Sequence, residues 1–183
     1  MTAAVTRIPR LKIVRSAALF GSVAPDIPLY LLSFGTFAWL RYIEGWEARP
    51  IFQKMFSEFF YENPWWIFFH NFLHAPLMLM SGIAVVYFRS QNWRQVQRSW
   101  WFWFYCSCLF HSIVDILTHN DDGPLTFFPL NWTTRFASPI SYWDPDHFGR
   151  EFSTFELCLD LAIILFLMSG WVMNRRKKRE ETR

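Results

Sequence analysis

The amino-acid sequence predicts an all-α fold, an integral membrane helical bundle of about four transmembrane helices. Hydrophobic residues make up 52% of the 183 residues and aromatic residues 21%, a composition far from that of an ordinary soluble domain. The charged residues are clustered, so that long uncharged stretches remain, and a membrane span needs about 20 mostly apolar residues. The length fits a single membrane domain over residues 1–183.

Four stretches have the length and composition of spans. They are residues 16–42, 66–88, 99–118 and 152–173. The first is interrupted at Gly21–Pro28, where Pro25 and Pro28 each remove a backbone donor, so we expect a broken helix there.

Two extended loops connect these spans. In residues 43–65 the apolar side chains recur at helical spacing, which indicates an amphipathic helix lying on the membrane surface. The loop of residues 119–151 is rich in Pro, Trp, Asp and Ser, and a connection of that length usually has a function of its own.

The basic residues predict the topology. They gather in an N-terminal arm (residues 1–15), between the second and third spans (Arg89, Arg94 and Arg98), and in a C-terminal tail (residues 174–183). By the positive-inside rule both termini face the cytoplasm and the two long loops face outward. A basic tail beside an apolar span is a topology signal, so we expect no nucleic-acid partner. The N-terminus resembles a signal peptide, but its apolar part is short and a proline follows the possible cleavage site, which favours a retained span.

A polar stripe crosses the third span. His111, Asp115 and His119 recur at intervals of four, on one face of a helix. His70 and His74 have the same spacing in the second span, and ionisable residues inside a membrane mark functional sites. At 1.5 Å per residue, His74 and His111 lie about 12 Å below the outer surface, and Asp26 lies about 15 Å above the inner surface of a core about 30 Å thick. We therefore expect Asp26, His74 and His111 to meet in one site.

Further polar residues lie near the outer surface. We expect five of them to line an entrance: His119, Asp121, Asp122, Asp144 and His147. Glu156 and Asp160 are four apart on the last span, where they either support the site from behind or pair with Arg135 or Arg150.

Imidazoles and carboxylates without a row of thiolates suit Zn²⁺ or another borderline divalent metal. The predicted metal ligands are Asp26, His70, His74 and His111. Asp115 is either a further ligand, a catalytic base, or a group that orients an imidazole. The sequence contains no GxSxG nucleophile motif and no glycine-rich phosphate loop.

These motifs, in this order, resemble the YdjM-like membrane-bound metal-dependent hydrolases of bacteria. The matching elements are Pro25–Asp26, the His70/His74 pair, and the run from His111 to Thr118, HSIVDILT. The later stretch DDGPLTFFPLNWTTRFASPISYWDPDHFG looks like a subgroup in which FPL and SPxSYWDP recur. The resemblance implies a multi-pass protein of the bacterial inner membrane that hydrolyses its substrate with a bound metal. Leu73 and Ala75 depart from the family, which often has a hydroxyl residue on each side of the second histidine.

The sequence thus predicts hydrolysis of a lipid or lipid-linked ester or phosphoester, because the site would open sideways to lipid and upward to water. The expected partners are membrane lipid and, in some readings, further copies of the chain. Three alternatives use the same residues. The polar stripe could carry metal ions or protons, which with four spans would need an oligomer. The histidines could bind haem through His111 with His70 or His74, or the chain could be a scaffold with a relic site.

Overall fold

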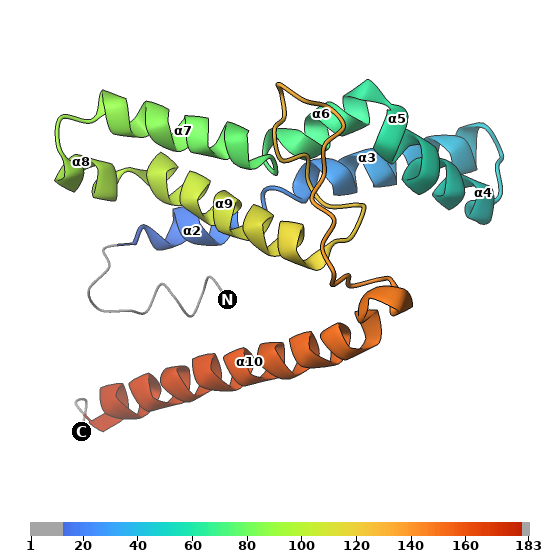
Figure 1. Ribbon diagram of the computed structural model, residues 1–183. Helices are drawn as coiled ribbons and strands as arrows, with labels where there is room; N and C mark the ends of the chain where they lie inside the picture. The colour runs from blue at the N-terminus through green and yellow to red at the C-terminus, as the bar shows by residue number, and fades with distance from the viewer. Residues whose placement is uncertain (1–12, 181–183) are drawn as a thin grey trace.

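The computed structural model describes residues 13–180, which form helices and loops without a β-strand (Figure 1). The predicted all-α fold is therefore confirmed. Residues 1–12 of the predicted basic arm and residues 181–183 of the tail lie outside the described residues. The helices up to the first long loop are α2 (Arg15–Gly21), α3 (Ile27–Ala38), the π-helix η1 (Trp39–Ile43), α4 (Ala48–Gln53), the π-helix η2 (Lys54–Phe59) and α5 (Phe60–Glu62). They are followed by α6 (Pro64–Phe72), α7 (Pro76–Arg89), α8 (Trp93–Arg98), α9 (Trp100–Thr118), the 3₁₀ turn η3 (Pro145–His147) and α10 (Gly149–Glu180).

The helices pack as two halves of the molecule, and helix α9 is the centre of the first half, which contains α2, α7 and α9. Both α2 and α7 pack along it (Figure 1). Gly21 makes the α2 contact possible, because a Cβ atom there would lie 2.5 Å from the carbonyl oxygen of Phe104. The buried core between these helices consists of Ala17, Ala24, Leu79, Phe104 and Cys108. Ser107 strengthens the contact, since its hydroxyl donates to the carbonyl oxygen of Ala18 at 2.7 Å.

The chain leaves the α-helix between α2 and α3. Helix α2 ends at Gly21 and α3 begins at Ile27, with Pro28 in its first turn, where a missing N–H costs nothing. The interruption lies within the predicted range of Gly21–Pro28, and it leaves the carbonyl oxygen of Ser22 free to bind a side chain.

The second predicted span is bent as well. The helix axis bends by 45° between α6 and α7, across residues 73–75. Pro76 explains the break, because proline has no N–H to donate and opens a new helix readily at its first turn. His74 lies in this break, so the expectation that His70 and His74 share one face of a continuous helix is corrected.

The second half of the molecule packs around α3 and α6. Its core consists of Leu40, Ile51, Met55 and Trp66. The helix predicted in residues 43–65 is present as α4, η2 and α5, which run without a gap from Ala48 to Glu62.

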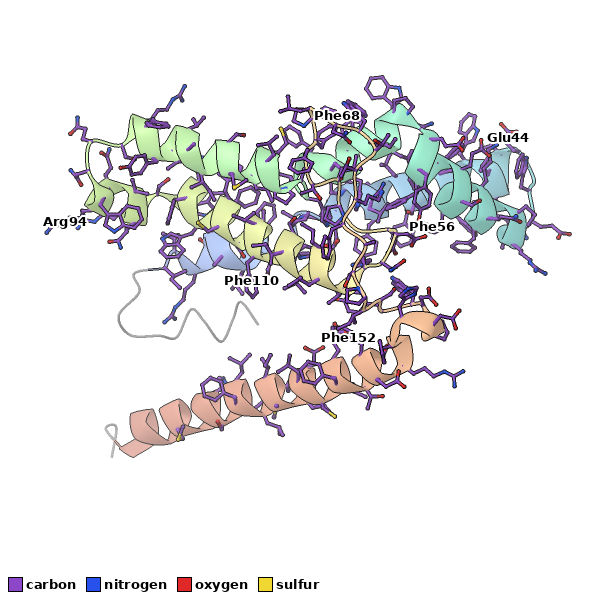
Figure 2. All side chains as sticks on the ribbon, in the orientation of Figure 1. Glu44, Phe56, Phe68, Arg94, Phe110 and Phe152 are labelled. Carbon is purple, nitrogen blue, oxygen red and sulfur yellow. The ribbon has the colours of Figure 1, made fainter. Side chains whose placement is uncertain are left out.

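The loop of residues 119–148 folds back over α6. Leu125 and Phe128 are buried against Ile67 and Ala75. Asn71, fully buried in α6, accepts a hydrogen bond from the Leu125 N–H at 2.7 Å and donates to the Ile67 carbonyl at 2.8 Å. At this crossing the ring of Phe68, labelled in Figure 2, meets that of Phe128 edge-on.

Two helices of the described chain are long and apolar enough to cross a membrane, Trp100–Thr118 and Gly149–Trp171. The bent pair α6 and α7 provides a third if it is counted as one span. The predicted count of four is not confirmed, because the break after Gly21 leaves α2 and α3 too short. Helix α10 leads away from the bundle (Figure 1), and no residue from Glu151 to Trp171 is buried.

Candidate metal centre

Four side chains from three separate segments meet where the two halves of the molecule join. They are Asp26, His74, His111 and Asp115, and one ligand atom of each lies within 4.8 Å of the others. Asp26 precedes α3, His74 lies in the α6–α7 break, and His111 and Asp115 are four residues apart on α9. The Asp26 carboxylate forms no capping hydrogen bond with α3, although aspartate often caps a helix.

The contacts within the cluster are regular. The Asp115 Oδ2 atom lies 3.2 Å from His74 Nε2 and 3.1 Å from His111 Nε2. The Asp26 Oδ1 atom lies 3.5 Å from each of the same two nitrogens. Each carboxylate therefore faces both imidazoles through a single oxygen atom.

Backbone carbonyls fix the orientation of both imidazoles. His74 Nδ1 lies 3.0 Å from the carbonyl oxygen of His70, and His111 Nδ1 lies 3.0 Å from that of Ser22. A carbonyl oxygen only accepts, so each Nδ1 carries a proton, and Nε2 is the ring nitrogen that faces the carboxylates. Such a hydrogen bond at the far nitrogen is the usual support of a metal-binding histidine.

This donor set fits a metal ion. Two Nε2 lone pairs and two carboxylate oxygens are all acceptors, and His111 Nε2 is buried without a hydrogen-bond partner. Four ligands at zinc distances of 2.0–2.2 Å, placed on a tetrahedron, are roughly 3.3–3.6 Å apart. The four imidazole–carboxylate distances of 3.1–3.5 Å are close to this spacing.

Neighbouring residues hold the cluster in place. The Ser112 hydroxyl, which is buried, donates to the carbonyl oxygen of His74 and so ties the α6–α7 break to α9. Gly21 lets α2 approach α9 closely enough for the Ser22 carbonyl to reach His111. Sequence reasoning missed Gly21, Ser22 and Ser112; the signal available was a serine directly after His111, inside an apolar helix.

His70 is close to the cluster but outside the group of four. Its ring packs at a tilt against His74, with centroids 4.5 Å apart, and against Phe60 at 5.0 Å. Both ring nitrogens are buried without a hydrogen-bond partner. Its carbonyl oxygen bonds Nδ1 of His74, whereas its ring supplies no atom to the group of four.

The side chains differ in access to the surroundings. The His74 side chain is 1% exposed, His111 18%, Asp115 16% and Asp26 37%. Asp26 is thus the most accessible member of the cluster, and a small molecule would approach from its side.

The five residues predicted to line an entrance fall into three places. His119, at the end of α9, bonds the Asp115 carbonyl through Nδ1 at 2.9 Å and meets the Tyr142 ring edge-on. Asp121 and Asp122 lie near Arg135, which donates to the Gly123 carbonyl and covers the Phe60 ring. Burial raises the pKa of Asp122 above its usual range and lowers that of Arg135.

Asp144 and His147 form a separate pair in the turn before α10. The Asp144 carboxylate accepts from the Asp146 N–H at 2.9 Å and lies 2.7 Å from His147 Nδ1. These hydrogen bonds hold the pKa of Asp144 below its usual range.

Glu156 and Asp160 lie on α10 and belong to no group of metal-binding side chains among the described residues. No ion pair of the described chain joins either of them to Arg135 or Arg150. Both predicted roles of these two residues stay predictions.

A comparison with models of protein families shows to which family the chain belongs. The family model described as YdjM inner membrane protein matches residues 1–178. The chain belongs to the YdjM inner membrane protein family. No curated protein and no solved structure matches it. Together with its apolar helices, the family makes this YdjM chain a membrane protein and confirms the resemblance seen in its motifs.

Proposed function

We propose that this YdjM chain is a membrane-bound metal-dependent hydrolase that acts on a lipid or lipid-linked ester or phosphoester. The observation that carries the proposal is the convergence of four acceptor atoms from Asp26, His74, His111 and Asp115, with both imidazoles oriented by backbone carbonyls. The membrane family supports a lipid substrate, because a site among apolar helices is reached most directly from the bilayer.

The distances suggest different roles for the two carboxylates. Asp115 has the shorter contacts to both histidines, so His74, His111 and Asp115 form the proposed ligand set. A divalent metal held there supplies Lewis-acid chemistry and activates water. Asp26 is more distant and more exposed, and it is placed to take a proton from water arriving at the cluster. The Ser22 and His70 carbonyls would hold each imidazole with its Nε2 atom toward the metal.

Metal analysis of the purified protein tests the site. We expect about one equivalent of Zn²⁺ or another divalent metal, lost in His74→Ala, His111→Ala and Asp115→Asn. His147→Ala is the matched control, because His147 lies outside the cluster. Metal content that is unchanged in the three variants would remove the site as described.

Hydrolysis is tested with the same proteins, using a fluorogenic phospholipid and p-nitrophenyl phosphate. We expect Asp26→Asn to keep the metal and lose turnover by about 10²–10⁴-fold, as for removal of a general base. If the wild type holds metal, hydrolyses neither probe and carries divalent ions across proteoliposomes, the transport alternative replaces the hydrolase.

A further inference from the structure

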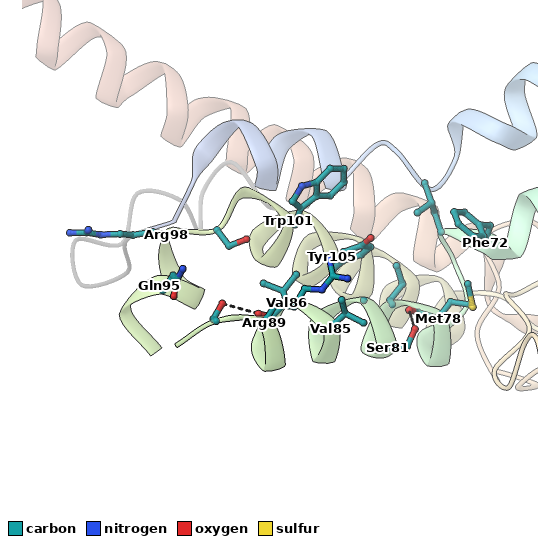
Figure 3. A pocket seen from close by; sticks show the side chains of 15 residues that line it. Phe72, Met78, Ser81, Val85, Val86, Arg89, Gln95, Arg98, Trp101 and Tyr105 are labelled. Carbon is teal, nitrogen blue, oxygen red and sulfur yellow. Dashed lines mark hydrogen bonds between the residues drawn. The ribbon is translucent and has the colours of Figure 1, made fainter. Parts of the chain in front are cut away.

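A second site lies along α7, apart from the metal cluster. A cavity of about 720 Å³ runs between α7, α8 and the first half of α9 (Figure 3). Its volume is within the range of small-molecule pockets, roughly 300–1,000 Å³. The lining side chains along its length are apolar, among them Leu79, Val85, Val86 and Trp101.

Gly82 shapes the floor of this groove. A Cβ atom at Gly82 would lie 2.9 Å from the ring of Tyr105, so only glycine lets that ring rest on α7. Trp101 stacks on Tyr105 with centroids 6.1 Å apart. The rings of Trp101 and Tyr105 on α9 therefore form one apolar side of the groove, and α7 forms the other.

One end of the groove is basic. Arg89 and Arg98 line it there, next to Ser90, Gln95 and Ser99. Figure 3 shows Arg89 reaching back along the groove and Arg98 extending away from it. Neither arginine forms an ion pair with any side chain that the structure describes. Residues 63–114, which include α7, α8 and the part of α9 beside the groove, contain no Asp or Glu that could neutralise them.

We propose that this groove binds an anionic phospholipid, with an acyl chain along α7 and the phosphate at the basic end, where the Arg98 side chain turns inward to join Arg89. An apolar channel that ends in unpaired guanidinium groups complements such a lipid in both shape and charge, since arginine binds phosphate through paired N–H donors. A neutral apolar partner would leave both arginines without a counter-charge.

The phosphate position is far from the metal cluster. Arg89 follows His74 by 15 residues along the chain, or about 20 Å at the helical rise. The phosphate of the bound lipid therefore lies away from the cluster, whereas the other end of the groove reaches Leu73, next to His74. Lipid binding in the groove does not depend on the proposed hydrolase activity.

Lipid-dependent stability tests the proposal on the full-length protein in detergent. We expect micelles containing phosphatidylglycerol to raise the melting temperature and phosphatidylcholine to leave it nearly unchanged. In Arg89→Gln/Arg98→Gln we expect phosphatidylglycerol binding to weaken about 30-fold. Arg94→Gln is the matched control, because Arg94 is on the same segment but does not line the groove, and it keeps the wild-type response.

A second variant addresses the apolar part. Val85 is 52% exposed and lines the groove, so Val85→Trp fills the channel without disturbing the core. We expect it to abolish the response to phosphatidylglycerol while keeping the metal content. Equal stabilisation by phosphatidylcholine, an equal loss in Arg94→Gln, or an unchanged response in Val85→Trp would each overturn the proposal. Stabilisation by inorganic phosphate alone, or by a second copy of the chain, would do the same.

Discussion

His74 and His111 are held by backbone carbonyls at Nδ1, whereas the ring nitrogens of His70 have no partner at all. This difference decides what each substitution should do. We predict that His70→Phe keeps the metal, because phenylalanine can stack on Phe60 and His74 and the His70 carbonyl is retained. Metal analysis beside His74→Ala checks this. Loss of metal from both variants would make His70 a ligand, as the HxxxH spacing alone suggests.

Asn71 uses both ends of its amide in a fully buried position. We predict that Asn71→Leu destabilises the protein by about 1–3 kcal/mol, because it leaves the Leu125 N–H without an acceptor. Thermal unfolding in detergent measures the loss. The loop of residues 119–148 should also become more sensitive to protease. The exposed neighbour Phe72→Leu is the control, and a loss of equal size there would point to general packing instead.

At this scale the sequence predicts the cluster well but not its supports. Depth along the spans brings Asp26, His74 and His111 to one level from spacing alone, and the structure brings them together. The partners at Nδ1 are carbonyl oxygens, which every residue has, so no sequence pattern can reveal them. Only the fold shows that His74 and His70 have different surroundings.

Among the helices, the close contact of α2 with α9 depends on Gly21. We predict that Gly21→Ala costs about 1–3 kcal/mol and lowers metal content, because the added Cβ meets the Phe104 carbonyl and moves Ser22 away from His111. The matched control is Gly35→Ala in α3, where nothing lies within 4 Å and stability should rise slightly. Thermal unfolding and metal analysis of both variants check this, and equal effects would contradict it.

The turn η3 connects the long loop to α10 through Asp144. Its carboxylate has a lowered pKa in the folded protein, chiefly because it accepts from the Asp146 N–H and then from His147. A lowered pKa stabilises the turn above the unfolded value of about 4, and this contribution is lost as the pH falls through the folded value. We predict faster hydrogen exchange at His147 and Gly149 below about pH 4, relative to intrinsic rates. Asp144→Asn should remove this pH dependence. Asp146→Asn should keep it, because the Asp146 carboxylate forms no hydrogen bond or ion pair among the described residues.

The helices themselves show where sequence patterns fail. Length and hydropathy predict α9 and α10 closely, because each is one uninterrupted apolar run. They do not predict the bend at residues 73–75, because hydropathy ignores the missing N–H of Pro76. The break that hydropathy misses is the one that carries His74.

Over the whole molecule, the cluster lies at the joint between two separately packed cores. Ala17, Leu79 and Phe104 belong to the core around α9, while Leu40 and Trp66 belong to the core around α3 and α6. His111 and Asp115 come from the first half, and Asp26 and His74 come from the breaks that connect the halves. An ion bound there would stabilise the arrangement of the halves as well as take part in chemistry.

Helix α10 stands outside this arrangement. It is attached by its first turns, where Phe152 meets the Tyr142 ring at 5.2 Å and the Ser153 hydroxyl donates to the Tyr142 carbonyl at 3.4 Å. Because no residue from Glu151 to Trp171 is buried, we predict that Glu156→Gln/Asp160→Asn keeps full metal content and unchanged turnover. Metal analysis and the phospholipid assay check this beside Asp115→Asn, which should lose both. If the double variant loses metal, α10 must lie against the cluster in the membrane, and these two carboxylates would then support the site from behind.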